Sequence, residues 1–169
     1  MAGKKKDLSD QKKISLENPK EVKISIVVSE WNEKITGALK QAAFKTLQEA
    51  GIPKSNISQL SVPGTFELPM GAKIANRNHS PHAIICIGCV IKGETDHDKY
   101  INQSVASAIQ MLNLSLDKPV IFGVLTPNNM QQAKDRAGGS HGNKGVEAAY
   151  TALHMIKIQK PTSKKKIGY

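Results

Sequence analysis

The chain has 169 residues, of which 39% are hydrophobic and only 4% aromatic. This length and apolar content suit one domain with a core built mainly from Ile, Val, Leu and Ala. The formal net charge is +10, but residues 1–20 hold six Lys against three acidic residues, and residues 157–169 hold five Lys and no acidic residue. Because the body is nearly neutral, these features disfavour nucleic-acid or membrane binding, and we interpret both ends as flexible, solubilising segments.

We therefore divide the chain into a basic leader at 1–20, a domain at 21–158 and a basic tail at 159–169. The start Met1-Ala2-Gly3-Lys4 lacks the apolar stretch of a signal peptide. No apolar run approaches the roughly 18 residues that a membrane span needs. The sequence thus predicts a soluble, cytoplasmic protein with no membrane partner.

Strand and helix signals alternate along the domain. The β-branched run 22–29 predicts a strand, and helical spacing of apolar residues from Glu33 predicts a helix that ends at Gly51 and Pro53. Further strands are predicted at 56–62, 83–91 and 120–125, and further helices at 68–77, 98–114, 129–137 and 143–157. This order predicts a flavodoxin-like α/β fold, a three-layer αβα sandwich around a central, mainly parallel four-stranded sheet.

Two shorter features bear on this architecture. The near-continuous apolar run 83–91 suits a central strand that is covered on both faces. The weakly apolar segment 14–16 of the leader could pair with the sheet edge of a neighbouring subunit.

Cys86 and Cys89 form a C-x-x-C motif, which is typical of redox pairs and of half a zinc site. They lie inside the predicted strand 83–91, whereas a redox pair usually opens a helix. A second C-x-x-C that would complete a zinc site is absent from the sequence. We interpret both cysteines as buried core residues and predict no metal.

In an open parallel sheet, ligands bind beyond the carboxyl ends of the strands. The loops there are predicted at 29–32, 63–67, 93–97 and 126–129, and all are rich in polar or aromatic residues. The sequence lacks the glycine-rich dinucleotide and triphosphate motifs, H-E-x-x-H and G-x-S-x-G. These absences disfavour dinucleotide enzymes, triphosphatases, zinc peptidases and serine hydrolases.

His97 stands where a helix is predicted to begin, two residues after Thr95. Backbone N–H groups at a helix start bind anions, the Thr95 hydroxyl adds a donor, and a histidine there can move protons near neutral pH. The same residues fit a helix cap by Thr95 or Asp96 with His97 merely exposed. The local pattern does not decide between the two interpretations.

Arg136 precedes the glycine-rich stretch 138–145. Such a stretch permits close backbone approach, and Arg binds phosphate oxygens in a fork. Taken alone, Arg136 is better explained as a helix-terminal arginine that binds the last carbonyls before a flexible turn.

Five segments in register, spread over residues 22–157, together resemble the lumazine synthase family. They are 31–32, 63–69, 88–97, 122–126, and 132–138 with 142–149. The resemblance implies condensation of 5-amino-6-ribitylaminouracil with 3,4-dihydroxy-2-butanone 4-phosphate. The product would be 6,7-dimethyl-8-ribityllumazine, formed at the penultimate step of riboflavin synthesis with release of phosphate and water, and the reaction would need no cofactor.

The resemblance also implies a role for individual residues. The residues implied to bind ribitylaminouracil are Trp31, Asn32, Thr65, Phe66, Glu67, Val90, Ile91, Phe122 and Lys144. Glu94, Thr95 and Arg136 are implied to bind phosphate, and His97 is implied to carry protons as the catalytic residue. Trp31 would stack on the heterocycle, Glu67 would accept hydrogen bonds from ribityl hydroxyls, and Phe122 would come from the adjacent subunit.

The family builds its sites between subunits of a pentamer, and in some members twelve pentamers close into an icosahedral shell. Stretch 138–145 lacks an insertion that often accompanies the smaller form, so the resemblance favours a 60-subunit homo-oligomer, with riboflavin synthase as a possible functional partner. Asp98, where many members have an aromatic residue, and Ser140, where a basic residue is frequent, depart from the pattern and bear on phosphate affinity. The alternatives are a non-catalytic shell-forming protein and a flavin-binding protein of the same fold.

Overall fold

The computed structural model describes residues 14–159. Its main sheet contains β1 (Ile24–Ser29), β2 (Ile57–Val62), β3 (Ala83–Cys89) and β4 (Val120–Leu125). The strand order is β2-β1-β3-β4, and every neighbouring pair is parallel. The predicted parallel four-stranded sheet is therefore confirmed.

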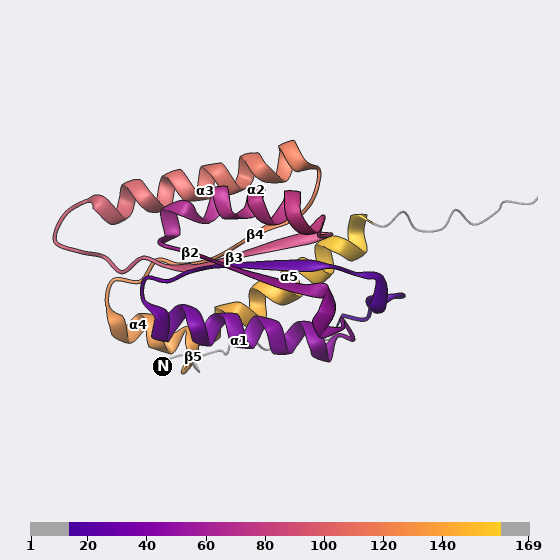
Figure 1. The fold of residues 1–169 in the computed structure, drawn as a ribbon. Coiled ribbons are helices and arrows are strands. Elements are labelled where there is room, and N and C mark those ends of the chain that lie inside the picture. Colours follow the sequence, from indigo (N-terminus) through magenta and orange to yellow (C-terminus); the bar gives the residue numbers. More distant parts are fainter. Residues whose placement is uncertain (1–13, 160–169) are drawn as a thin grey trace, which may run out of the picture.

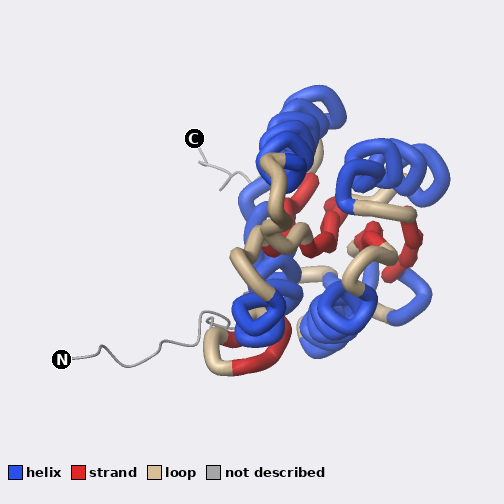
Figure 2. The backbone as a smooth tube through the Cα atoms, turned by 90° about the vertical axis from the view of Figure 1, so that its left-hand side faces the viewer, coloured by secondary structure: helices blue, strands red, loops and turns tan. Residues whose placement is uncertain are grey.

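Helices cover both faces of this sheet (Figure 1). On one face lie α2 (Leu68–His79) and α3 (His97–Leu116), which contact each other. On the other lie α1 (Glu33–Glu49) and α5 (Lys144–Gln159), with the short α4 (Met130–Asp135) beside them. Figure 2 shows the strands enclosed between the two helical layers, which confirms the three-layer sandwich.

The burial pattern follows from strand position. Every residue of β3 is buried, because β1 and β4 flank it and helices cover both of its faces. In β2, at the edge of the sheet, the two end residues are buried and residues 58–61 are more exposed. The prediction that the apolar run beginning at residue 83 is a central strand is confirmed.

Most element boundaries differ from the prediction by one or two residues, and two of these differences change the local structure. The strand predicted at 83–91 ends at Cys89, although the Val90 N–H still donates to the Leu125 carbonyl at 2.9 Å. The helix predicted at 129–137 stops at Asp135, because the chain turns into a small antiparallel hairpin of β5 (Ala137–Gly139) and β6 (Gly142–Asn143). Gly138 has a φ of 113°, a conformation that favours glycine.

Part of the predicted leader packs on the domain. Leu16 is 7% exposed and belongs to the core cluster that contains Leu39 and Leu153. Residues 14–16 form no strand within this chain, and their pairing with a neighbouring sheet stays a prediction. Residues 1–13 of the leader and 160–169 of the tail lie outside the described residues. None of the helices from residue 14 to 159 is long and apolar enough to cross a membrane.

Cys86 and Cys89 are free thiols within β3. Cys86 belongs to the core cluster on the α2 and α3 side, and Cys89 to the cluster on the α1 and α5 side. Burial raises the pKa of the Cys86 thiol to about 12 and that of Cys89 to about 11. Their interpretation as core residues rather than a redox pair is confirmed. Within residues 14–159, no group of three or more His, Cys, Asp or Glu could hold a metal ion.

Candidate functional site

The loops that follow the four strands meet at one edge of the sheet. The Glu30 N–H donates to the Val62 carbonyl at 2.9 Å, which joins the ends of β1 and β2. The Lys92 N–H donates to the Pro127 carbonyl at 3.0 Å, which joins the loops after β3 and β4. Two cavities at this edge contain most of the predicted site residues.

The first cavity, the Trp31 cavity, has a volume of about 430 Å³ and lies beside β1, β3 and the starts of α2 and α3. The predicted site residues in its lining are Trp31, Asn32, Thr65, Phe66, Glu67, Val90, Ile91 and His97. Trp31 is 73% exposed and Phe66 is 58% exposed. Two large rings that expose apolar surface in one cavity suit a flat heterocyclic ligand.

Asn32 fixes the loop that carries Trp31. Its φ of 60° is left-handed, a conformation that Asn tolerates better than most residues. Its side-chain Nδ2 donates to the Cys89 carbonyl at 2.9 Å. This bond ties the start of α1 to the end of β3, so the loop that carries Trp31 is fixed beside the end of the central strand.

Two glycines make room for side chains of the Trp31 cavity. A Cβ atom on Gly64 would lie 2.8 Å from Glu67 Oε2, so the glycine leaves space for that carboxylate. A Cβ atom on Gly88 would lie 2.7 Å from Thr65 Oγ1. Thr65 is accordingly only 5% exposed, packed against β3 in the cavity wall.

His97 is the first residue of α3, and it lines the Trp31 cavity. Its backbone N–H donates to Thr95 Oγ1 at 3.4 Å, whereas Asp96 forms an ion pair with Lys99 at 2.8 Å. Thr95 thus caps the start of α3 weakly, and His97 lines the cavity at the same time, so the two interpretations of this segment do not exclude each other. Glu94 and Thr95 are exposed and lie outside the linings of both cavities.

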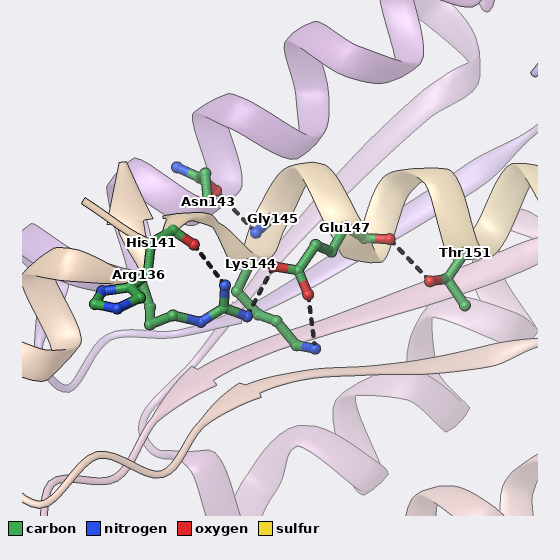
Figure 3. Close-up of polar contacts among 7 residues, drawn as sticks. All are labelled: Arg136, His141, Asn143, Lys144, Gly145, Glu147 and Thr151. Atoms are coloured by element: carbon green, nitrogen blue, oxygen red, sulfur yellow. Dashed lines mark hydrogen bonds and ion pairs between the residues drawn. The ribbon is translucent and has the colours of Figure 1, made fainter. Parts of the chain in front are cut away.

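The second cavity, the Arg136 cavity, has a volume of about 470 Å³ and lies beside β4 and the start of α5. It is lined by Arg136, Lys144 and His141 among others. Arg136 Nη1 donates to the His141 carbonyl at 2.7 Å, and Nη2 is 2.7 Å from Glu147 Oε1 (Figure 3). The Arg136 side chain therefore does not bind the last carbonyls of α4, the alternative that the sequence suggested.

One chain thus distributes the predicted residues over two cavities. Phe122 lies half-buried on β4 and lines neither of them. The sequence analysis assigned no role to Ile101 in the first cavity, to His141 in the second, or to Glu147, which pairs with Arg136 of the second cavity. Glu147 follows Lys144 at helical i, i+3 spacing, a signal that could have pointed to it.

Comparison of the sequence with known proteins identifies the family of this chain. The sequence model of one family, described as 6,7-dimethyl-8-ribityllumazine synthase, matches residues 21–160. The chain belongs to the 6,7-dimethyl-8-ribityllumazine synthase family. This membership confirms the resemblance seen in the sequence. It makes the chain an enzyme that performs the lumazine synthase reaction of riboflavin biosynthesis.

Individual lumazine synthases are similar over most of their length. The protein of Cytophaga hutchinsonii is 55% identical over 131 residues, which are 78% of this chain and 82% of that protein. The protein of Flavobacterium johnsoniae is 47% identical over 163 residues, 96% of this chain and 86% of its own. The protein of Bacteroides fragilis is 52% identical over 135 residues, 80% of this chain and 94% of its own. Members of the family typically oligomerise.

The structure places the two positions that depart from the lumazine synthase pattern. Ser140 is exposed in the turn between β5 and β6, and its Oγ lies 3.1 Å from Nδ1 of His141. His141 lines the Arg136 cavity, next to Ser140 in the chain. Asp98 lies in the first turn of α3, one residue after His97.

Proposed function

We propose that the condensation takes place at a site that two neighbouring copies build together. One copy contributes the Trp31 cavity, and the next contributes the Arg136 cavity. The observation that carries this proposal is the separation of the two cavities in one chain. The first is lined from the α2 and α3 side and the second from the α4 and α5 side. The two substrates must meet in one site, and the two cavities of a single chain are separate. A neighbouring copy can bring its Arg136 cavity to the Trp31 cavity.

The Trp31 cavity is the proposed site for 5-amino-6-ribitylaminouracil. The indole of Trp31 stacks on the pyrimidine, as its exposed ring allows. Glu67 accepts hydrogen bonds from ribityl hydroxyls. The Val90 N–H already donates to Leu125, so its carbonyl is the backbone group that it can offer to the pyrimidine edge.

The Arg136 cavity is the proposed site for the phosphate of 3,4-dihydroxy-2-butanone 4-phosphate. Arg136 and Lys144 both line this cavity and supply positive charge, and a guanidinium binds phosphate oxygens in a fork. We therefore place Lys144 at the phosphate, although the resemblance implied that it binds ribitylaminouracil. Glu94 and Thr95, on the loop before His97, approach the same phosphate from the copy that holds the pyrimidine. Phe122 comes from β4 of the copy that holds the phosphate.

His97 is the proposed proton carrier. Imine formation between the substrate amine and the ketone releases one water, and elimination then releases phosphate. Ring closure by attack of the ribitylamino nitrogen on the remaining carbonyl releases a second water. Each step moves a proton to or from a reacting group, and an imidazole exchanges protons near neutral pH. These steps need no electron transfer, so the proposal includes no cofactor. Holding both reactants in a productive orientation can lower the barrier by about 7–11 kcal/mol.

The test is direct turnover. The purified chain is incubated with both substrates, and the fluorescence of the lumazine product is followed over time. We expect product well above the uncatalysed background, and we expect the unphosphorylated ketone to react more slowly. Background rates with both substrates present would contradict the enzymatic role and favour a non-catalytic shell-forming or flavin-binding protein.

We further propose that twelve pentamers of this chain close into a 60-subunit shell in the cytoplasm. The short turn at Ser140 and His141 between β5 and β6 supports the shell, because it leaves no bulky insertion before α5. Sedimentation velocity tests the size. A single boundary at the mass of five subunits would contradict the closed shell and leave the shared site intact. Pull-down of riboflavin synthase tests that protein as a functional partner.

A further inference from the structure

Glu147 lies between the two cationic side chains of the Arg136 cavity (Figure 3). Its Oε1 is 2.7 Å from Arg136 Nη2, and its Oε2 is 3.3 Å from Lys144 Nζ. The side chains of Arg136, Lys144 and Glu147 are only 21%, 29% and 14% exposed, so solvent screens their charges incompletely. Two cations and one carboxylate leave this cluster with a single net positive charge.

The backbone holds Glu147 firmly in place. The Gly145 N–H donates to Asn143 Oδ1 at 2.8 Å at the start of α5. A Cβ on Gly145 would overlap the Leu39 carbonyl oxygen, so the glycine lets α5 pack closely on α1. One turn later, Thr151 Oγ1 donates to the Glu147 carbonyl at 2.8 Å. Glu147 is thus fixed in the first turn of α5, where the helix dipole favours a carboxylate.

Arg136 is held from two sides. Nη1 donates to the His141 carbonyl at 2.7 Å, and the Arg136 carbonyl accepts from the Lys144 N–H at 2.9 Å. The contact with Glu147 is close but not aligned, because Glu147 Oε1 has no hydrogen-bond partner among residues 14–159. The carboxylate therefore orients the guanidinium by charge and leaves donor directions of Arg136 for a ligand.

We propose that Glu147 is a positioning residue for a phosphate monoester. It holds Arg136 and Lys144 next to each other against their mutual repulsion, so that both donate to one anion. This inference rests on the proposed function for the identity of the substrate. Glu147 itself does not contact the phosphate. Without its charge, the two cations repel each other and turn toward solvent, and the anion loses a preformed site.

The direction in which phosphate affinity changes on removing the Glu147 charge separates a positioning role from simple repulsion of the anion. A carboxylate near an anion site also repels the anion, so a Glu147 that acted only through its field would weaken phosphate binding. Replacement by Gln keeps the shape of the side chain and removes the charge. Positioning predicts that Glu147→Gln weakens phosphate binding, whereas pure repulsion predicts that it strengthens it.

The experiment is a calorimetric titration of the assembled protein with inorganic phosphate at fixed ionic strength. We expect Glu147→Gln to raise the Kd about tenfold, the order of one charge-assisted hydrogen bond. KM for the phosphorylated substrate should rise by a similar factor, and KM for ribitylaminouracil should rise less. Glu147→Asp, which keeps the charge on a shorter side chain, should recover part of the loss. Arg136→Ala should abolish the titration and thereby place the phosphate in this cavity.

The matched control is Glu49→Gln. Glu49 forms an exposed ion pair with Lys45 at 3.8 Å on α1, outside the lining of both site cavities. This variant makes the same charge change and should bind phosphate like the wild type. Unchanged or tighter binding by Glu147→Gln, or no phosphate binding by the wild type, would overturn the inference. If Glu147→Gln does not fold, Glu147→Ala takes its place, and unchanged or tighter phosphate binding by that variant overturns the inference. If the wild type forms no lumazine, the proposed function fails. The phosphate titration would still show whether Glu147 positions Arg136 and Lys144.

Discussion

Trp31 is the side chain that we propose stacks on the flat pyrimidine substrate. It is the only Trp in the chain, and 73% of its surface is exposed beside a cavity that also contains Phe66 and His97. Asn32 holds this exposed ring through its bond to the Cys89 carbonyl. An exposed indole on a fixed loop loses little conformational freedom when it stacks on a ligand.

Replacing Trp31 should weaken the binding of the pyrimidine substrate. We expect Trp31→Ala to raise KM for ribitylaminouracil about tenfold, the order of one lost stacking contact. The intrinsic fluorescence of the wild type, which has no other Trp, should be quenched by the same substrate. Leu114→Ala serves as control, because Leu114 is 78% exposed at the far end of α3. Equal KM values for Trp31→Ala and the wild type would rule out stacking at this position.

The buried thiols give a pH dependence of stability. Burial raises the pKa of Cys86 from 9.0 to about 12 and that of Cys89 from 9.0 to about 11. Well below pH 9 both thiols are protonated in the folded and the unfolded chain, and they contribute no pH dependence. Above pH 9 the unfolded chain loses these protons first, so the free energy of unfolding should fall as the pH rises.

Urea unfolding at pH 8, 9 and 10 measures this effect. The midpoint should decrease between pH 9 and pH 10, and Cys86→Ala should show a smaller decrease than the wild type. A thiol reagent should label the native chain at pH 8 far more slowly than the urea-unfolded chain. Rapid labelling of both thiols in the native state would contradict their burial.

At the scale of elements, the sequence predicted the regular parts of the fold and lost accuracy at the hairpin before α5. Strand 120–125 and the start of the helix at Glu33 match the structure, because apolar periodicity reports burial directly. The hairpin of β5 and β6 was expected as a loop, since its glycines suit turns and its partner strand is very short. The division of the site into two cavities could not be predicted from the sequence either, because it depends on the side of the sheet edge to which each loop turns.

The close packing of α5 on α1 can be tested with a pair of glycine substitutions. A Cβ at Gly145 would overlap the Leu39 carbonyl oxygen, whereas a Cβ at Gly37 meets nothing within 4 Å. Gly145→Ala should lower the free energy of unfolding by about 1–3 kcal/mol and displace the start of α5. Gly37→Ala, inside α1, should raise it by about 0.5–1 kcal/mol through helix propensity. Urea unfolding compares both with the wild type, and equal stabilities would show that α5 can shift without cost.

At the scale of the whole molecule, the account depends on two copies sharing each site. The Trp31 cavity and the Arg136 cavity are separate within one chain, and lumazine synthases typically oligomerise. Sequence motifs placed both sets of residues at the carboxyl edge of the sheet, and the family resemblance assigned only Phe122 to the adjacent copy. That assignment is a property of the assembly.

Complementation between two inactive variants measures this sharing most directly. His97→Ala and Arg136→Ala are each assembled alone and then co-assembled in equal amounts, and lumazine formation is followed. Each variant alone should be slowed by about 10²-fold or more, the usual contribution of a proton carrier or a charged contact. Random co-assembly pairs an intact Trp31 cavity with an intact Arg136 cavity at some interfaces. Each head-to-tail interface joins two different surfaces, and each surface is intact with a probability of one half. About a quarter of the wild-type activity should therefore return. No recovery in the mixed assembly would show that both residues act from the same chain and would contradict the shared site.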